Sequence, residues 1–365
     1  MYLDKLTILN FKNIAHAEVE FSSKFNCFVG ENGSGKTNLL DSLYMMSMCK
    51  SSVGMSDLQC VRADEEFFMI DGLYNFDENV NHRITISLKK GESKSVKFDG
   101  RQYDRLSEHI GVIPVVLVYP YDTSLINDSG DERRKYINAL MSQIDRSYLF
   151  NVVRYNKLLA ERNQLLKHRV SSDELLEVLD MQLADVGQLI FQRRKDVIEE
   201  IAPIVSEYYS ALAEGSNQVE LAYRSQLHNS MMSDLLLQSR DRDKIMQHTT
   251  VGVHRDDLIM TFAGRQLKRF GSQGEQKSFL IALKLAQYDV IARKTDIKPI
   301  LLLDDIFDKL DAKRVERLIK LVSDSRFGQI FITDSNKVRL SNILDGLTAE
   351  HRLWQVCDGE FEQIK

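Results

Sequence analysis

Cysteine and proline are both scarce in this chain, and it contains no long hydrophobic run. Its 365 residues include 4 Cys, and the spacings between them match neither a CxxC pair nor a zinc-binding pattern. Cysteines scattered in this way are typical of reduced thiols in a cytoplasmic protein, so we expect no disulfide framework. With only 4 Pro and 18 Gly, the chain also has little of the composition that forms long disordered linkers.

Segments that would place the protein in or across a membrane are absent from the sequence. No stretch approaches the roughly 20 consecutive apolar residues that a membrane-spanning helix requires. The segment from Met1 to Lys5 is too polar to begin a secretory signal peptide. We therefore expect a cytoplasmic protein with no membrane partner. The net charge of -5 neither indicates nor excludes nucleic-acid binding, because binding depends on where the cations lie.

The most informative feature that is present is a glycine-rich phosphate-binding loop. It follows an apolar run from Phe25 to Val29 and precedes a helix-like stretch, which is the strand–loop–helix context that this motif needs. Backbone N–H groups and the positive end of the helix dipole would bind the phosphates. Lys36 would bridge the β- and γ-phosphates, and Thr37 would ligate Mg²⁺. The predicted nucleotide-binding residues are Gly30, Glu31, Asn32, Gly33, Ser34, Gly35, Lys36, Thr37 and Asn38.

A second apolar run, from Ile300 to Leu303, ends in two acids near the other end of the sequence. A buried parallel strand delivers the residue after it to the carboxyl edge of the sheet, where nucleotide sites lie. We expect Asp304 to hold Mg²⁺ through water and Asp305 to orient the attacking water, so the predicted catalytic residues are Lys36, Asp304 and Asp305. The alternatives are a chance match of the loop pattern and two acids that cap the next helix. The occurrence of both motifs together favours a nucleotide site.

A further glycine-containing stretch precedes an apolar helix that begins near Ser278. It consists of Ser272, Gln273, Gly274, Glu275 and Gln276. Small residues at a helix start form an anion-binding nest. Since the phosphate-binding loop already covers its own phosphates, we expect this nest to bind the γ-phosphate of a different subunit. The alternative is an ordinary capping box between Ser272 and Glu275. Both interpretations can hold, because capping geometry is what exposes the nest.

The order of elements predicts an α/β fold with a mainly parallel or mixed sheet, helices on its faces and an antiparallel meander. Alternating apolar residues predict two strands within residues 3–21 and a meander over 67–98. Further strands are predicted at 112–119, 257–262, 300–303 and 329–333, and helices at 274–294 and 312–322.

A long polar segment with helical periodicity lies between the two halves of the predicted site. Apolar residues recur at helical spacing from Ile137 to Leu166 and from Leu175 to Val197, and Ser171 and Glu174 form a capping box between the two series. This pattern predicts an antiparallel helical hairpin, and we expect helices over residues 206–250. The chain therefore divides into a nucleotide-binding head (lobe I), residues 1–125 and 246–365, and an inserted helical arm (lobe II), residues 126–245.

These motifs resemble those of the ATP-binding-cassette superfamily, in its chromosome-maintenance branch. Residues 30–38 are similar to the phosphate-binding loop of Rad50, SMC and RecF proteins, and residues 272–276 resemble their signature motif. Residues 120–138, 251–258 and 301–311 resemble the RecF family in particular. The last of these stretches includes the residues that match a D-loop, Leu310 and Asp311. The resemblance covers essentially the whole chain in order.

The resemblance to RecF implies an ABC-type ATPase head with ATP and Mg²⁺ as cofactors, and a homodimer that forms on ATP. It implies a DNA repair protein that binds double-stranded or gapped DNA and helps RecR- and RecO-like mediators to load recombinase. It also implies a nucleoid-associated location, and slow, DNA-stimulated ATP hydrolysis that resets the clamp. The alternative is an ATP-gated scaffold of SMC or Rad50 type without significant turnover.

The chain departs from the family pattern at two places. Asp308 and Lys309 stand where a D-loop usually has Ser-Glu, and Thr333 and Asp334 stand where transporters carry a switch histidine. Whether Thr333 or Asp334 senses the γ-phosphate is left open at this stage. Gln59 is a candidate for the lid-loop glutamine, with an ordinary surface-loop residue as the alternative.

Candidate DNA contacts are cations of the predicted meander, for which a solvated strand face is an equal alternative. They are Arg83, Lys89, Lys90, Lys94 and Lys97. The arm offers similar candidates in Arg133, Arg134, Lys135, Arg193, Arg194 and Lys195. His254 and Arg255 have two interpretations, a site role near the nucleotide or the lobe boundary, or a structural pairing of Arg255 with Asp256 or Asp257.

Overall fold

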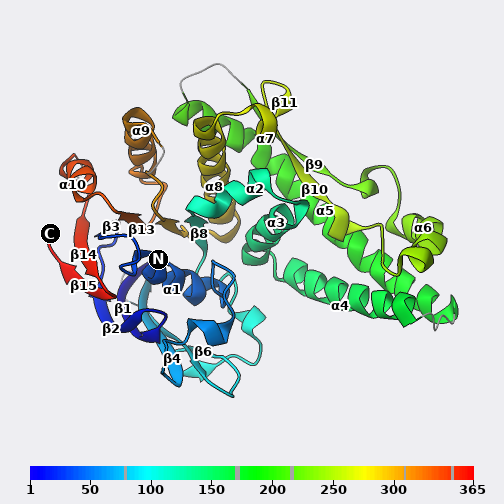
Figure 1. The fold of residues 1–365 in the computed structure, drawn as a ribbon, viewed down its shortest axis with the longest axis horizontal. Coiled ribbons are helices and arrows are strands. Elements are labelled where there is room, and N and C mark those ends of the chain that lie inside the picture. The colour runs from blue at the N-terminus through cyan, green and yellow to red at the C-terminus, as the bar shows by residue number, and fades with distance from the viewer. Residues whose placement is uncertain (78–79, 169–172, 214–217, 308–309, 347–348) are drawn as a thin grey trace. The chain divides into compact units, whose positions relative to one another are not determined.

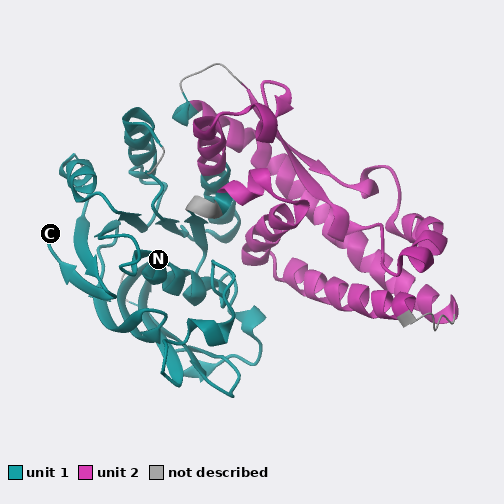
Figure 2. Cartoon of the chain, in the orientation of Figure 1, with its two compact units in different colours: residues 1–122, 211–213, 283–365 teal, residues 123–210, 214–282 magenta. Residues whose placement is uncertain are grey.

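The computed structural model describes residues 1–77, 80–168, 173–213, 218–307, 310–346 and 349–365 (Figure 1). The chain divides into two compact units, which Figure 2 shows in different colours. Unit 1 is made of residues 1–122, 211–213 and 283–365, and unit 2 of residues 123–210 and 214–282. Among the described residues, no helix combines the length and the apolar character that a bilayer crossing demands.

Unit 1 contains a six-stranded sheet in the order β15-β14-β3-β13-β12-β8. The strands from β14 to β8 run parallel, and β15 closes the edge as an antiparallel hairpin with β14. Every residue of β3, β12 and β13 is buried, as expected for a parallel sheet covered on both faces. The strands are β3 (Phe25–Val29), β8 (Val115–Val118), β12 (Ile300–Leu303), β13 (Ile330–Asp334), β14 (His351–Cys357) and β15 (Glu360–Gln363). The predicted mainly parallel core is confirmed.

A second sheet of unit 1 is antiparallel and has the order β2-β1-β4-β5-β6-β7. Its strands are β1 (Tyr2–Phe11), β2 (Ile14–Glu20), β4 (Phe67–Asp77), β5 (Val80–Lys89), β6 (Ser95–Phe98) and β7 (Arg101–Gln102). Ile84, Ile86 and Leu88 of β5 are buried, while the residues between them are partly exposed, so the alternation in the sequence marks the core face. Both the predicted strand pair and the predicted meander are confirmed.

Helices of unit 1 follow the strands that carry the site. They are α1 (Lys36–Met48), which follows β3, α9 (Ala312–Val322), which follows β12, and α10 (Lys337–Asp345), which follows β13. Two short 3-10 segments, η1 (Asp57–Cys60) and η2 (Leu106–Glu108), lie on the connections. Helix α8 (Gln273–Thr295) begins in unit 2 and ends in unit 1.

Unit 2 is mainly helical and includes the predicted hairpin. Helices α4 and α5 are antiparallel. Arg162, near the end of α4, contacts Asp180, near the start of α5, at 2.6 Å. Tyr148, at the start of α4, contacts Arg194, further along α5, at 2.9 Å. The helices are α2 (Ser124–Asn127), α3 (Gly130–Ile144), α4 (Arg146–His168), α5 (Asp173–Leu212), α6 (Met232–Met246) and α7 (Leu267–Phe270). The predicted capping box before α5 includes Ser171, which lies outside the described residues.

Two predictions for this part of the chain are wrong. Residues 206–250 are not all helical, since β9 (Val219–Arg224) forms a strand whose alternating Val219 and Leu221 are buried. The strand predicted at 257–262 exists as β10 (Asp257–Phe262), but it pairs antiparallel with β9 and with β11 (Arg265–Gln266) in a separate three-stranded sheet. Unit 2 consequently continues to Ala282, well beyond the boundary that we placed at residue 245.

Candidate nucleotide site

The carboxyl edge of the parallel sheet brings the two predicted halves of the site together. Strands β3 and β12 lie on either side of β13, and all three run in the same direction. The phosphate-binding loop follows β3, the acids Asp304 and Asp305 follow β12, and Thr333 lies at the end of β13. A small cavity of about 160 Å³ at this edge is lined by loop residues and both acids. Its lining residues are Asn32, Gly33, Gly35, Lys36, Thr37, Asn38, Asp304 and Asp305.

Glycines shape the phosphate-binding loop for two different reasons. Gly33 and Gly35 have positive φ angles of 83° and 117°, a conformation that side chains with a Cβ disfavour. Gly30 is needed for space, because a Cβ there would lie 2.2 Å from the carbonyl oxygen of Val356 in β14. The C-terminal hairpin also contacts the loop directly, since the Gly359 N–H donates to the Ser34 carbonyl at 2.7 Å.

Lys36 points back into the loop. Its Nζ donates to the carbonyl oxygens of Gly30, at 2.7 Å, and Glu31, at 2.8 Å, and the residue is only 7% exposed. Burial lowers the pKa of Lys36, and the nearby carboxylates of Asp305 and Asp304 oppose that shift. A buried ammonium group beside backbone N–H donors is suited to bind an anionic phosphate chain.

Thr37 and Asp304 are in direct contact although 267 positions separate them in the sequence. The Thr37 hydroxyl donates to the Asp304 carboxylate at 2.9 and 3.1 Å. Asp304 is 2% exposed, and burial raises its pKa while hydrogen bonds from Thr333 and Thr37 oppose the shift. A hydroxyl and a carboxylate on one cavity wall are the hard oxygen ligands that Mg²⁺ prefers, so these residues fit the predicted ion.

Asp305 adopts an unusual backbone conformation. Its φ is 43°, in the left-handed region that costs a non-glycine residue free energy, although Asp tolerates it better than most. Its backbone N–H donates to the Thr333 hydroxyl at 2.9 Å, and the residue lines the cavity beside Lys36. Strained backbone of this kind is common at functional sites.

Thr333 and Asp334, left open by the sequence, have different environments. The Thr333 hydroxyl donates to Asp304 at 2.6 Å. Asp334 is fully buried and accepts two hydrogen bonds from Arg339 of α10, both at 2.6 Å. Arg339 also donates to the Phe307 carbonyl at 3.4 Å. Asp334 therefore fixes α10 to β13. Neither residue lines the cavity, but Thr333 contacts Asp304, which does.

Sequence reasoning missed Asn13, in the turn between β1 and β2. Its side chain donates to the Ser34 carbonyl at 3.3 Å and accepts from the Asn38 amide at 2.8 Å, so it braces the phosphate-binding loop. The preceding Lys12 is buried against Asp41 of α1 at 2.6 Å. A lone Asn in a turn carries no motif, so the sequence offered no signal for this contact.

The signature stretch lies in unit 2, at the start of α8. Ser272 and Glu275 form the predicted capping box, with the Ser272 N–H donating to the Glu275 carboxylate at 2.7 Å and the Glu275 N–H donating to the Ser272 hydroxyl at 3.3 Å. Ser272 and Gln273 are exposed. The Gln276 amide donates to the Gly271 carbonyl at 3.0 Å. The capping interpretation is thus confirmed.

The remaining motif residues have local roles in the structure. Asp311 is the N-cap of α9, accepting from the Arg314 N–H at 2.9 Å, and Leu310 precedes it. The departures at Asp308 and Lys309 lie outside the described residues. Gln59 is exposed and caps η1 by accepting from the Ser56 N–H at 2.8 Å, which is the behaviour of a surface-loop residue.

The predicted DNA-binding cations of unit 1 are mostly paired with carboxylates. Arg83 lies 3.5 Å from Asp71, Lys89 lies 3.3 Å from Glu92, and Lys90 lies 3.9 Å from Glu66. Lys94 is 6% exposed and lies 2.6 Å from Asp57. Lys97 is exposed on β6. The sheet edge therefore carries much less uncompensated positive charge than the sequence suggested.

In unit 2, the two stretches that resemble RecF meet one another. Arg133 of α3 contacts Asp257 at 2.5 Å, and Arg134 donates to the Asp256 carbonyl at 2.9 Å. Arg194 is buried and lies 3.3 Å from the Asp256 carboxylate. Arg133 and Arg194, proposed as DNA contacts from the sequence, therefore act as structural ion pairs.

His254 belongs to this same buried region. Its two ring nitrogens lie 2.9 Å from the Tyr155 hydroxyl and 3.1 Å from the Thr249 carbonyl, and Arg255 donates to that carbonyl at 3.3 Å. Burial lowers the pKa of His254 to about 4, which keeps the ring neutral at physiological pH. These contacts support the structural interpretation of the stretch, although the partners differ from those predicted for Arg255.

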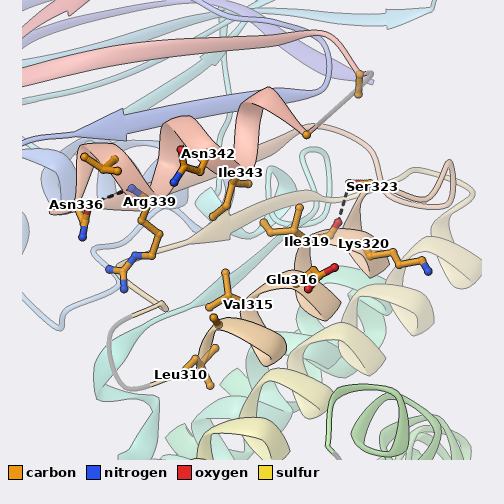
Figure 3. Close-up of a pocket in the computed structure, with 14 residues that line it drawn as sticks. Leu310, Val315, Glu316, Ile319, Lys320, Ser323, Asn336, Arg339, Asn342 and Ile343 are labelled. Carbon is orange, nitrogen blue, oxygen red and sulfur yellow. Dashed lines mark hydrogen bonds between the residues drawn. The ribbon is translucent and has the colours of Figure 1, made fainter.

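A larger cavity in unit 1, of about 830 Å³, lies between α9 and α10. Figure 3 shows Val315 and Ile319 of α9 on one side of it and Ile343 of α10 on the other. Arg339, which clamps Asp334, also lines it. It holds neither the phosphate-binding loop nor the acids, so volume alone does not identify the nucleotide site.

Comparison with known proteins places these features in a family. Residues 2–351 match the family model described as the RecF/RecN/SMC N terminal domain. The chain is 45% identical over 365 residues to the DNA replication and repair protein RecF of Parabacteroides distasonis, covering 100% of both sequences. It is also 45% identical over 368 residues to the protein of that name from Phocaeicola vulgatus, covering 100% of this chain and 99% of the relative.

Solved structures agree with this assignment. A structure of the recombination mediator protein RecF with ATP, from the RecFOR pathway, matches with a TM-score of 0.89 and 28% identity, over 100% of this chain and 98% of the other. An Smc head domain from Pyrococcus furiosus matches with a TM-score of 0.59 and 18% identity, over 100% of this chain and 96% of the other, and so shows the shared fold alone. The phosphate-binding loop, the acidic strand and the inserted helices are thus those of an ABC-type ATPase fold, and this chain belongs to the RecF family.

Proposed function

We propose that this protein is an ATP-dependent DNA repair protein that dimerises on ATP, binds duplex DNA near single-strand gaps and helps RecO- and RecR-like mediators to load recombinase. The observation that carries the proposal is the contact between Thr37 and Asp304, at 2.9 Å. It unites a phosphate-binding loop with a metal-binding carboxylate from the other end of the chain. The relatives named RecF, one of them described with ATP in the RecFOR pathway, support the biological setting.

The chain's own residues can perform each binding step. Loop N–H groups and Lys36 would hold the β- and γ-phosphates, while Thr37 and Asp304 would hold Mg²⁺, which neutralises charge on the phosphates. Asp305, on the cavity wall beside Lys36, would orient the attacking water. Its side chain is one methylene shorter than that of a glutamate, so its carboxylate would reach the water less far. This geometry supports slow hydrolysis, suited to a timer.

Dimerisation would follow from the exposed start of α8. The exposed residues Ser272 and Gln273 lie at the positive end of a helix of 23 residues, which is a favourable environment for a phosphate. Because one phosphate-binding loop already surrounds its own nucleotide, the signature stretch would contact the γ-phosphate held by a second subunit. ATP would then join two subunits, and loss of the γ-phosphate would release them.

Fewer residues support the proposed DNA contact than support the ATP site. Lys97 is exposed on the antiparallel sheet, and Arg83, although 3.5 Å from Asp71, has a side chain that is 65% exposed. Phosphate contacts by such cations carry no base specificity, which suits a protein that recognises DNA structure rather than sequence. Binding should weaken as salt rises, since each phosphate contact releases counterions.

Sedimentation velocity tests the proposal. Wild-type protein should sediment as a monomer with ADP and as a dimer with ATP, and the ATP dimer should co-sediment with a gapped duplex more strongly than with single-stranded DNA. Lys36→Ala should stay monomeric with ATP, because the γ-phosphate loses its buried cation. Dimers that form equally with ADP and ATP, or DNA binding that ignores the nucleotide, would contradict the proposal.

The alternative function is an ATP-gated scaffold of SMC or Rad50 type without significant turnover. The short side chain of Asp305 is the feature that favours it, since an Asp carboxylate reaches the attacking water less far than a Glu carboxylate would. A phosphate-release assay over several hours, with and without gapped duplex, separates the two. Release of more than one phosphate per protomer excludes the scaffold, whereas ATP-dependent dimers without release support it.

A further inference from the structure

One hydroxyl group connects both predicted catalytic acids. The Thr333 side chain, at the end of β13, is fully buried. Its Oγ1 donates to the Asp304 carboxylate at 2.6 Å and accepts the backbone N–H of Asp305 at 2.9 Å. A hydroxyl has one proton to donate and lone pairs to accept, so these two bonds are compatible and together fix its orientation.

The two bonds have different consequences for the two acids. The first holds one oxygen of the Asp304 carboxylate, and so limits rotation of the group that would face the metal. The second satisfies the part-buried N–H of Asp305 and so helps to stabilise its left-handed backbone conformation, in which φ is 43°. Thr333 is thus placed to orient the side chain of Asp304 and to hold the backbone of Asp305.

Thr37 and Thr333 differ in the second contact that each can make. The Thr37 hydroxyl donates to Asp304 at 2.9 Å, and its lone pairs stay available for Mg²⁺, so it would ligate the ion and hold the carboxylate together. Thr333 does not line the nucleotide cavity, and its hydroxyl accepts the Asp305 N–H instead. Of these two threonines, Thr333 is the one that links the Asp304 carboxylate to the Asp305 backbone.

We propose that Thr333 is a positioning residue for the ATPase site, whose hydroxyl orients the Asp304 carboxylate toward the metal and holds the Asp305 backbone in its water-facing conformation. The inference rests on the proposed ATP hydrolysis, and it assigns a role to a residue that does not line the nucleotide cavity. Loss of the Thr333 hydroxyl should affect some steps and not others. Nucleotide binding without metal should be unchanged, whereas more Mg²⁺ should be needed and hydrolysis should be slower.

Thr333→Val removes the hydroxyl at nearly constant volume and is the informative variant. We expect it to bind a fluorescent ATP analogue in EDTA as wild type does. The Mg²⁺ concentration that gives half-maximal enhancement of nucleotide binding should rise about tenfold, as for loss of a bond that orients a metal ligand. Turnover should fall about 10- to 100-fold in kcat with little change in KM, and Thr333→Ser should recover most of both losses.

A matched control separates positioning from general stability. Thr85 of β5 also donates to a carboxylate, Asp71, at 2.6 Å, but in the antiparallel sheet away from the cavity. Thr85→Val should lower the melting temperature without changing the Mg²⁺ requirement. If Thr333→Val does not fold, the pair Thr333→Ser and Thr333→Ala makes the same comparison, since only Ser keeps the hydroxyl.

The outcomes are distinguishable from failure of the proposed function itself. Wild type that neither binds nor hydrolyses ATP contradicts the proposed function. Wild type that hydrolyses ATP, together with a Thr333→Val variant whose Mg²⁺ requirement and kcat match it, overturns the role of Thr333 alone. A Thr333→Ser variant as impaired as Thr333→Val also overturns it, because the hydroxyl would then not be the active feature.

Discussion

At the scale of single residues, Asp305 has two features that bear on the site, its position at the edge of the parallel sheet and its left-handed backbone conformation. It follows β12 directly, so its position at the sheet edge could be predicted from the apolar run before it. Its left-handed φ of 43° could not, because Asp tolerates that region without requiring it. The conformation arises from tertiary contact, through the bond from its N–H to Thr333.

Replacement of Asp305 tests its part in the chemistry. Asp305→Asn keeps the size and tolerance of the left-handed region but removes the negative charge, so it can no longer accept a proton from water. We expect single-turnover hydrolysis to slow about 10²-fold or more, the usual contribution of a general base, while ATP binding is retained. Rapid-quench measurement of ADP formation by pre-bound ATP gives this rate directly.

Asp296 offers the matched control for that variant. It also has a left-handed backbone, with φ of 55°, but is exposed and lies outside the cavity. Asp296→Asn should leave the single-turnover rate unchanged. A rate for Asp305→Asn that equals those of wild type and Asp296→Asn would remove Asp305 from the mechanism.

At the scale of elements, contacts between distant segments determine which strands pair, and the sequence pattern alone could not predict this pairing. The strand at 257–262 was predicted at its correct bounds but assigned to the wrong sheet, because periodicity reports which face of a strand is buried and not which strand it pairs with. The strand at 219–224 was missed, although Val219 and Leu221 alternate with polar residues, since it lies between long helices. Local pattern predicted α9 to the residue, because one face of that helix is strongly apolar.

The ion pair between Arg133 and Asp257 is the element-scale contact that joins α3 to β10. Both side chains are nearly buried, with 11% and 12% exposure. Arg133→Ala would leave Asp257 with the more exposed Arg224 as its remaining ion-pair partner, and should lower the free energy of unfolding by about 3 kcal/mol. Chemical denaturation followed by circular dichroism measures this change.

Arg193 provides the comparison for that prediction. Its guanidinium lies 3.4 Å from Asp145, but its side chain is 59% exposed, so water already screens the pair. Arg193→Ala should cost less than about 1 kcal/mol. Equal losses for the two variants would show that the contact of α3 with β10 is no more important than a surface ion pair.

At the scale of the whole molecule, the candidate site was predictable where it depends on motifs and unpredictable where it depends on packing. The phosphate-binding loop, Asp304, Asp305 and the capped signature helix could be named because each has a short sequence pattern with a physical reason. Asn13 and Arg339 could not, since each acts through contacts that only the folded chain creates. The DNA-binding cations stay a prediction, and the sequence pattern could not show that acids from neighbouring segments pair with most of them.

The central claim is that ATP joins two subunits because the signature stretch of one contacts the γ-phosphate held by the other. Mixing two defective variants tests it most directly. Lys36→Ala cannot hold the γ-phosphate, and Ser272→Arg blocks the signature with a bulky cation, so each alone should neither dimerise on ATP nor hydrolyse it.

In an equal mixture, a mixed dimer pairs the intact Lys36 of one subunit with the intact Ser272 of the other. Because neither variant dimerises alone, the dimer that forms is the mixed one, and one of its two sites is complete. We therefore predict that phosphate release by the mixture recovers to about half of the wild-type rate, with an ATP-dependent dimer in sedimentation. A mixture as inactive and monomeric as its two components, with both variants folded, would contradict the claim.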